Sequence, residues 1–235
     1  LHLIHSITDH PQLNCVCTHH EQAAAIAADG YSRTTGNPAV AITTSGPGAT
    51  NAITGICCSY YDSVPLIMIT GQVSTFRMTG ATGVRQIGFQ ETPIVDIVKP
   101  VVKYSFQIKD PYEIKYQLSR AFDIATSGRP GPVLIDIPDN LQRELLNLEK
   151  LNKYKVYSKK EKVFSIKESV FKKLFNYIRR AQRPIIIAGW GIHLSKTKDE
   201  FISFAESLGI PIALTWGASD IIPSSHPLNV GTFGT

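Results

Sequence analysis

Short apolar runs alternate with helix-like segments along the first 140 residues of the chain. The runs are nearly continuous in Val, Ile, Leu and Ala, as expected for strands of a parallel sheet that is covered by helices on both faces. The pattern predicts strands at 39–43, 66–70, 101–104 and 133–137. It predicts helices at 22–34, 49–61 and 112–127. Such alternation is typical of an α/β fold built from βαβ units.

A second α/β pattern follows a polar stretch. Residues 165–180 form an amphipathic pattern, with Val170, Leu174, Tyr177 and Ile178 on one side of the predicted helix. A strand at 185–188, a helix ending near 208 and a strand at 212–214 come next. We therefore expect a first domain at 1–145, a linker at 146–160 and the start of a second domain at 161–235. Because the chain opens on Leu1 and the second domain has few strands, we expect a truncated fragment.

Charge and cysteine content narrow the function classes. The net charge is +5, but twelve of the 24 Lys and Arg residues lie between positions 150 and 183, which indicates a solvated linker and helix face rather than a nucleic-acid groove. No apolar run approaches the ~20 residues that a membrane-spanning helix requires. The cysteines at 15, 17, 57 and 58 have neither zinc-site nor disulfide-framework spacing. We expect a cytoplasmic protein with no nucleic-acid, membrane or metal site of its own in this chain.

Glu21 is the first candidate for chemistry, because it stands at the head of the alanine-rich run 23–28. Alanine is the strongest helix former, and its small side chain lets backbones approach closely. An unpaired buried carboxylate is costly. Glu21 is therefore either a surface residue stabilised by the helix dipole, or a carboxylate held for a partner outside the chain.

The turn 45–51 is the second candidate. Gly46 and Gly48 allow backbone conformations that side chains forbid, so the main chain can closely approach a flat ligand. The alternative is a plain strand-to-helix turn in which Asn51 is solvated. A Gly189-x-Gly191 pair after the strand at 185–188 is not a dinucleotide fingerprint, because Leu194 stands where the third glycine is needed.

Further motifs follow in a fixed order. They are Asp-Ser-Val-Pro-Leu at 62–66, Ile-Thr-Gly-Gln-Val at 69–73, Gly-Phe-Gln-Glu at 88–91 and Thr-Ser-Gly-Arg-Pro-Gly-Pro-Val at 126–133. Together with Glu21 and the glycine turn, they resemble the pyrimidine-binding domain of thiamine diphosphate enzymes, most closely that of acetohydroxyacid (acetolactate) synthase. The resemblance covers most of residues 14–140.

The resemblance implies roles for these residues. Thiamine diphosphate becomes a carbon nucleophile when C2 of its thiazolium loses a proton to the cofactor's own imino group. Glu21 would favour that tautomer by hydrogen bonding to N1' of the aminopyrimidine, with a proton affinity raised by its small-residue, apolar pocket. Positions matching Gly46, Pro47 and Asn51 lie against the aminopyrimidine.

Two further segments match family motifs. Phe89 and Gln90 match a segment that faces the reacting carbon, where a neutral amide can donate to a developing alkoxide; the alternative is a structural loop glutamine. Arg129 matches an arginine that contacts FAD, although relatives without flavin share its motif, so it is either an FAD contact or a turn residue. His19, His20 and His226 have no pattern that indicates a partner.

The implied enzyme decarboxylates a 2-keto acid, with pyruvate expected, and transfers the two-carbon unit to a second carbonyl. The resemblance also implies a homodimer or homotetramer. It implies that Mg²⁺ is held through a third domain, whose Gly-Asp-Gly motif is absent from this sequence, so the fragment alone should be inactive. The loop at 73–88 is longer than in biosynthetic synthases, and Asp139 stands where they carry lysine. A sugar or aldehyde acceptor, simple decarboxylation, and a non-catalytic binding or assembly module therefore remain alternatives.

Overall fold

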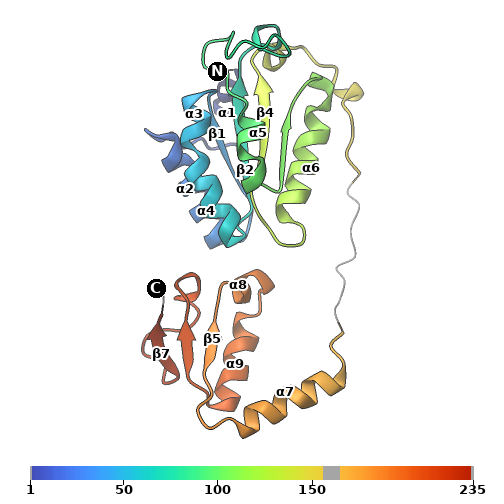
Figure 1. The fold of residues 1–235 in the computed structure, drawn as a ribbon. Helices are drawn as coiled ribbons and strands as arrows, with labels where there is room; N and C mark the ends of the chain where they lie inside the picture. The colour runs from blue at the N-terminus through green and yellow to red at the C-terminus, as the bar shows by residue number, and fades with distance from the viewer. Residues whose placement is uncertain (1, 156–164, 234–235) are drawn as a thin grey trace. The chain divides into compact units, whose positions relative to one another are not determined.

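The computed structural model describes residues 2–155 and 165–233. The chain divides into two compact units, Leu1–Lys160 and Glu161–Thr235, which we describe separately. Figure 1 shows both units coloured along the chain.

Unit 1 is built on a four-stranded parallel sheet in the order β1-β2-β4-β3. The strands are β1 (Ala39–Thr43), β2 (Leu66–Gln72), β3 (Tyr104–Gln107) and β4 (Val133–Pro138). The predicted α/β class is confirmed. The third strand was predicted at 101–104, but it begins only at Tyr104, because Lys99–Val101 forms a 3-10 turn around Pro100. Proline cannot donate a ladder hydrogen bond, so the apolar residues before Tyr104 enter the core from a turn.

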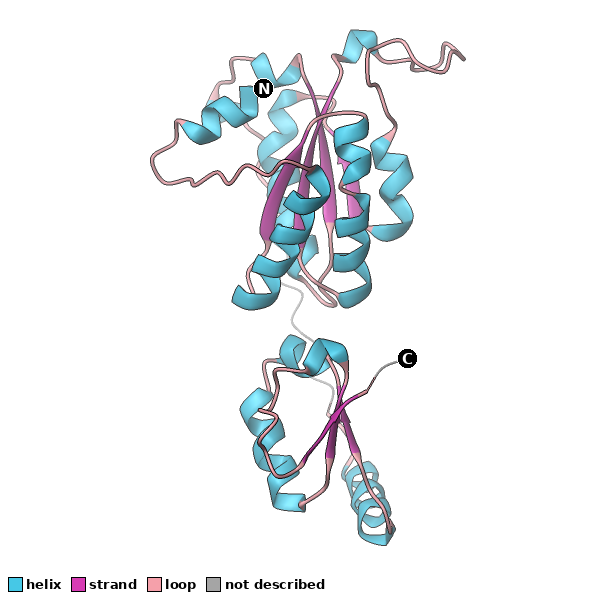
Figure 2. Cartoon of the chain, turned by 90° about the vertical axis from the view of Figure 1, so that its left-hand side faces the viewer, coloured by secondary structure: helices cyan, strands magenta, loops and turns pink. Residues whose placement is uncertain are grey.

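Helices cover both faces of this sheet (Figure 2). The core on one face joins β1 and β2 to α2 (Glu21–Thr35), α3 (Pro47–Asn51), α4 (Ile53–Asp62) and α5 (Ile94–Val98). The core on the other face joins β2 and β4 to α6 (Ile114–Thr126), with α1 (His2–Thr8) at its margin. The single helix predicted at 49–61 is divided at Ala52, where ψ opens to −12° and the amide bonds to the Ala49 carbonyl.

The alanine run of α2 packs against α4. Ala25 is fully buried, and a Cβ on Gly55 would lie 2.5 Å from the Ala25 Cβ. Interiors are packed at crystal-like density, so this glycine is needed for the two helices to approach so closely. The other side of the run remains uncovered in unit 1, where Ile26 is 45% exposed.

Unit 2 contains a three-stranded parallel sheet of β5 (Ile186–Ala188), β6 (Ile212–Leu214) and β7 (Asn229–Thr232). Its helices are α7 (Glu168–Arg180), α8 (Gly191–Ser195) and α9 (Lys198–Leu208). Ile212 and Leu214 pack against Ala205 of α9 in the core of this unit. The amphipathic α7 forms as the pattern predicts, although none of its residues is buried.

The segment predicted as a linker begins with residues that lie against α6. The Asn152 amide donates to the Tyr112 carbonyl at 3.1 Å, and the Tyr154 hydroxyl donates to the Asp123 carboxylate at 2.8 Å. The Tyr154 ring also packs edge-on against Tyr116. Residues 156–160 of the expected linker lie outside the described residues.

Candidate cofactor site

The sequence candidates lie mostly at one edge of the unit 1 sheet, where its parallel strands end. The turn that follows β1 leads into α3, and the loop 73–92 follows β2. Figure 1 shows this loop beyond the arrowheads of the strands. In open α/β sheets, ligands bind in the crevice outside the carboxyl ends of the strands.

Glu21 and Asn51 form the centre of the candidate site. Glu21 is the first residue of α2 and is half-buried, and Asn51 Nδ2 donates to its Oε2 at 3.1 Å. A Cβ on Gly48 would lie 3.3 Å from Glu21 Oε1, so the glycine brings the backbone of the turn beside the carboxylate. His20 caps the helix, since its Nδ1 accepts from the Gln22 amide at 3.1 Å; this local role was not predicted.

The charge state of Glu21 differs from the expectation. The hydrogen bond from Asn51, and then one from the amide of Glu21 itself, hold the pKa of the Glu21 carboxyl below its ordinary value and outweigh desolvation. The predicted rise in proton affinity is therefore absent in this chain taken alone. The reason is that a half-buried carboxylate with two donors is stabilised as the anion.

Gln90 lies directly on the glycine turn. Gly46 has φ +59°, and a Cβ placed there would come within 2.7 Å of the Gln90 Cβ and 2.8 Å of its carbonyl oxygen. Gln90 itself has φ +62°, which is uncommon for a residue with a side chain. The neighbouring Phe89 is 85% exposed. The structure thus places Glu21, Asn51, Pro47, Gly46 and Gln90 along one continuous turn-and-loop surface.

Arg129 is not part of that surface. It precedes β4, and its Nε donates to the Ser63 hydroxyl at 2.5 Å. Ser63 is the C-cap of α4 and comes just before β2. Both residues therefore lie near the amino ends of their parallel strands, at the edge opposite the glycine turn.

Asp139, where the resembling synthases carry lysine, is paired. Its carboxylate forms an ion pair with Arg143 and accepts from the Ser74 hydroxyl at 3.4 Å. Since the neighbouring Arg143 cation offsets its charge, Asp139 is not an isolated anion.

Sequence reasoning missed Glu91. This carboxylate accepts hydrogen bonds from Thr79, Ile87 and Gly88 within the loop 73–92. The available signal was a carboxylate placed directly after a loop rich in glycine and threonine. The hydroxyl of Thr43, at the end of β1, was also missed; it is buried and has no hydrogen-bond partner among the described residues.

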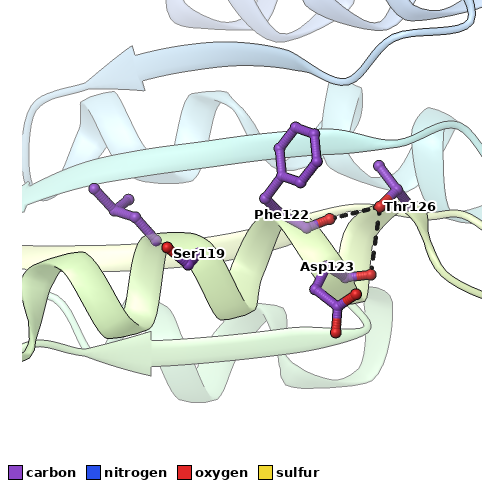
Figure 3. Close-up of a pocket in the computed structure, with 5 residues that line it drawn as sticks. Ser119, Phe122, Asp123 and Thr126 are labelled. Atoms are coloured by element: carbon purple, nitrogen blue, oxygen red, sulfur yellow. Dashed lines mark hydrogen bonds between the residues drawn. The ribbon is translucent and has the colours of Figure 1, made fainter. Parts of the chain in front are cut away.

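A hollow on the outer side of α6 carries less chemistry. It is lined by Leu118, Ser119, Phe122, Asp123 and Thr126 (Figure 3). The Thr126 hydroxyl donates to the Phe122 carbonyl at 2.8 Å, and Asp123 already accepts from Tyr154. The side chains of Thr126 and Asp123 are therefore used within the fold, and α6 covers the sheet face opposite α2.

Within residues 2–155 and 165–233, no cluster of three or more His, Cys, Asp or Glu residues is placed to hold a metal ion. Over the same residues, no helix combines the length and apolar character needed to cross a membrane. His226 contacts Glu206 at 3.2 Å within unit 2.

Comparison with known proteins places this chain in a family. Residues 1–97 match the N-terminal TPP binding domain of thiamine pyrophosphate enzymes, and residues 171–235 match the central domain of the same enzymes. The chain belongs to this thiamine pyrophosphate enzyme family.

Its relatives include large subunits of acetolactate synthase. The chain is 40% identical over 224 residues to a probable acetolactate synthase large subunit of Methanocaldococcus jannaschii, covering 93% of this chain and 36% of that protein. It is 40% identical over 230 residues to the corresponding probable subunit of Methanococcus aeolicus, covering 96% and 37%. It is 38% identical over 229 residues to the acetolactate synthase large subunit of Buchnera aphidicola, covering 93% and 38%. The chain thus spans less than two fifths of the length of these relatives.

Proposed function

We propose that this chain supplies the pyrimidine-binding part of the active site of a thiamine diphosphate-dependent carboligase of the acetolactate synthase type. The observation that carries the proposal is the Glu21 carboxylate, held by Asn51 at 3.1 Å beside the Gly46–Gly48 turn. The domain assignments at 1–145, 146–160 and 161–235 belong to the same proposal.

The residues present suit the aminopyrimidine ring. Side chains at Gly46 and Gly48 would collide with Gln90, Thr44 and Glu21, so the two glycines allow the loop residue and the carboxylate to lie directly against the turn. Glu21 offers a carboxylate that can accept a proton shared with a ring nitrogen. When bound, thiamine diphosphate supplies a carbon nucleophile at C2 of its thiazolium.

Each side chain then has a defined task. Glu21 would hydrogen bond to N1' of the ring, and Asn51 fixes the orientation of the carboxylate through its amide. Pro47 and the exposed Phe89 would contact the ring. Gln90 would donate a hydrogen bond to the negatively charged oxygen that develops on the keto acid, without adding a charge of its own.

The lowered pKa of Glu21 bears on this mechanism. An ionised carboxylate can accept a hydrogen bond from N1'–H, which the imino tautomer of the ring carries, and would thereby favour that tautomer. Covering by a second subunit would remove water from around Glu21 and raise its pKa toward that of the ring nitrogen, since desolvation disfavours the charged form. A homodimer or homotetramer is therefore part of the proposal, with the exposed side of the α2 alanine run, including Ile26, as the contact.

The substrates in the proposal are a 2-keto acid, with pyruvate first, and a second carbonyl compound as acceptor. The longer loop 73–88 supports the alternative of a sugar or aldehyde acceptor, or of simple decarboxylation. The pairing of Asp139 with Arg143 removes much of the electrostatic reason to reject an anionic acceptor. Acetolactate formation therefore stays the leading activity.

The proposals for Mg²⁺ and FAD rest on the family resemblance. Mg²⁺ would be held through a Gly-Asp-Gly segment that this sequence does not contain, so the chain by itself should not turn over. FAD would use Arg129, but the bond from Arg129 to Ser63 supports a turn-holding role instead. A cytoplasmic location is proposed from the cysteine spacing.

Product analysis with labelled pyruvate tests the proposal in the protein that contains this chain. We expect thiamine-dependent acetolactate from pyruvate alone. Preferred transfer to an added aldehyde or keto-sugar would select the alternative acceptor, and release of acetaldehyde alone would select simple decarboxylation. Absence of any thiamine-dependent product would favour the non-catalytic binding or assembly module. An active species that sediments as a monomer would refute the proposed homodimer or homotetramer.

A further inference from the structure

The loop 73–92 is tied down at both ends by one glutamine. Gln72, the last residue of β2, accepts from the Val73 amide at 3.0 Å through Oε1. Its Nε2 donates to the Thr92 carbonyl at 2.8 Å and to the buried Asp136 carboxylate at 3.1 Å. The base of the loop is therefore anchored to the centre of the sheet.

A single carboxylate closes the loop from within. Glu91 Oε1 accepts from the Thr79 amide at 2.6 Å and from the Thr79 hydroxyl at 2.9 Å. Glu91 Oε2 accepts from the Ile87 amide at 3.1 Å and from the Gly88 amide at 3.4 Å. The two oxygens thus join parts of the loop that are separated by the exposed stretch 80–87.

The hydrogen bonds keep this carboxylate ionised. Partial burial raises the pKa of the Glu91 carboxyl, but the bonds from Thr79, Ile87 and Gly88 together outweigh burial and leave the pKa below its ordinary value. Bonds to a charged acceptor are stronger than neutral ones. Glu91 therefore acts on the loop as an anion.

Closure of the loop fixes the residue next to Glu91. Gln90 has φ +62°, and its Cβ and carbonyl lie where a Cβ on Gly46 would be, at 2.7 and 2.8 Å. Gly88, on the other side, is equally constrained, since a Cβ there would lie 2.9 Å from the Arg77 carbonyl oxygen. Gln90 is thus held between the loop and the glycine turn.

We propose that Glu91 is a positioning residue, whose ionised carboxylate closes the loop 79–88 and thereby places Gln90 over the Gly46 turn. The proposal rests on the proposed function, because it deepens the role given to Gln90 there. Glu91 does not itself touch the reacting atoms. It acts by restricting the backbone of the residue that does.

Amide hydrogen exchange of Glu91→Gln in the protein that contains this chain tests the loop directly, without cofactor or substrate. The variant keeps the size of the side chain but turns an amide NH₂ toward one set of loop donors. We expect faster exchange at Thr79, Ile87 and Gly88, with no change in α6. Glu144→Gln, at an exposed glutamate in the same unit, is the matched control and should exchange like the parent protein. Unchanged exchange in Glu91→Gln overturns the proposal.

A double-mutant cycle with Gln90→Ala tests the link to chemistry. Because a misplacement of about 1 Å can cost ~10²-fold in rate, we expect Glu91→Gln to lower kcat by about ten- to a hundredfold with a smaller change in KM. In the Gln90→Ala background, Glu91→Gln should lower kcat by less than about threefold, since the effects of residues that act through one another are not additive. Full additivity overturns the proposal. If the parent protein makes no thiamine-dependent product, the proposed function fails, while the exchange experiment still decides whether Glu91 closes the loop.

Discussion

Two carboxylates in unit 1 have opposite surroundings. Asp136, in the middle strand β4, is fully buried and accepts from Thr70 Oγ1 at 2.7 Å, Gln107 Nε2 at 2.8 Å and Gln72 Nε2 at 3.1 Å. Glu21, at the start of α2, is half-buried and has one side-chain donor, Asn51. Asp136 is satisfied by the fold, whereas Glu21 retains capacity for a partner from outside it.

The register of the sheet explains the difference. In the parallel ladders, Asp136 pairs with Thr70 of β2 and with Gln107 of β3, so three neighbouring strands bring polar side chains to one level. Glu21 stands outside this ladder and lies beside the turn at Gly48, with Asn51 as its side-chain donor. A buried acid that meets its donors by register is structural, and a half-buried acid with one side-chain donor retains capacity to bind a ligand.

Replacing Glu21 should have the largest effect. Glu21→Gln removes the proton acceptor for the ring nitrogen, and general acid–base groups contribute typically ~10²–10⁴-fold to rate. We expect the exchange of the thiamine C2 proton for deuterium, followed by NMR, to slow within this range in the protein that contains this chain. The free energy of unfolding should change by less than about 0.5 kcal/mol, as at most surface sites.

The control for Glu21 is an exposed carboxylate elsewhere in unit 1. Asp62 is unsuitable because its carboxylate pairs with Arg33, so Glu144→Gln, at an exposed glutamate outside the candidate site, serves instead. It should leave C2 exchange unchanged. Exchange at the parent rate in Glu21→Gln would remove Glu21 from the mechanism.

Replacing Asp136 should do the opposite of replacing Glu21: it should lower the free energy of unfolding and leave the C2 exchange rate of the folded protein unchanged. Asp136→Asn turns an amide NH₂ toward the donors of Gln72 and Gln107 or toward Thr70. Leaving buried polar groups unsatisfied costs ~1–3 kcal/mol, so we expect a loss of that size in urea unfolding. The C2 exchange rate should follow only the fraction of folded protein. A large loss of exchange in fully folded Asp136→Asn would contradict the division between the two carboxylates.

The pH dependence of the free energy of unfolding distinguishes Asp136 from Glu21. Burial raises the pKa of the Asp136 carboxyl, and the hydrogen bonds from Gln107, Thr70 and Gln72 offset this only in part. The folded state then binds a proton that the unfolded state has released, so the free energy of unfolding falls as pH rises from the unfolded value of ~3.9 through the folded pKa. Glu21 and Glu91, with lowered pKa values, act in the opposite sense and lose their contribution as pH falls. Urea unfolding at a series of pH values should show the decline, and Asp136→Asn should abolish it.

The glycine turn gives a prediction of intermediate size. Gly46→Ala adds a Cβ at 2.7 Å from Gln90, at φ +59° and ψ −124°, where L side chains are disfavoured. Gly36→Ala, in the left-handed well at φ +70° with no atom within 4 Å of the added Cβ, reports left-handed strain alone, which is ~1–2 kcal/mol. Urea unfolding should show a larger loss for Gly46→Ala, and the excess reports the contact with Gln90 together with the more strained backbone of Gly46. Equal losses would mean that Gln90 is free to move away.

Much of the fold could be predicted from the pattern of the chain, because β1, β2 and β4 are apolar runs whose burial follows from their composition. The start of β3 could not, since Val102 is buried and extended but directly follows the 3-10 turn at 99–101 and precedes the strand. The hydrophobic pattern indicates which residues are buried, but here apolar residues are buried or half-buried both in the strand and in the segment before it. Tertiary contact decides between them.

The candidate site was predictable where the family resemblance supplied both partners of a contact, and not where a role depends on side-chain contacts that the resemblance does not supply. The Glu21–Asn51 pair joins two motifs that the sequence singles out. The closure of the loop by Glu91, the pairing of Asp139 with Arg143 and the bond from Arg129 to Ser63 each depend on geometry that spacing does not reveal. The lowered pKa of Glu21 likewise follows from its donors and exposure, which composition cannot give.

The smallest effect is expected at Asp139, a third carboxylate that lies just beyond the end of β4. Its side chain is 36% exposed and is paired with Arg143, and exposed ion pairs contribute ~0.2–1 kcal/mol. Asp139→Asn leaves the Arg143 cation in excess and should raise the share of pyruvate used as acceptor, by no more than about fivefold on that energy scale. Arg143→Gln leaves the anion in excess and should lower that share by a similar factor. The measurement is the ratio of acetolactate to the product of a competing neutral aldehyde, with labelled pyruvate. Because the two variants alter the local charge with opposite sign, shifts in the same direction would show that the loop shape, and not the charge at Asp139, governs the choice of acceptor.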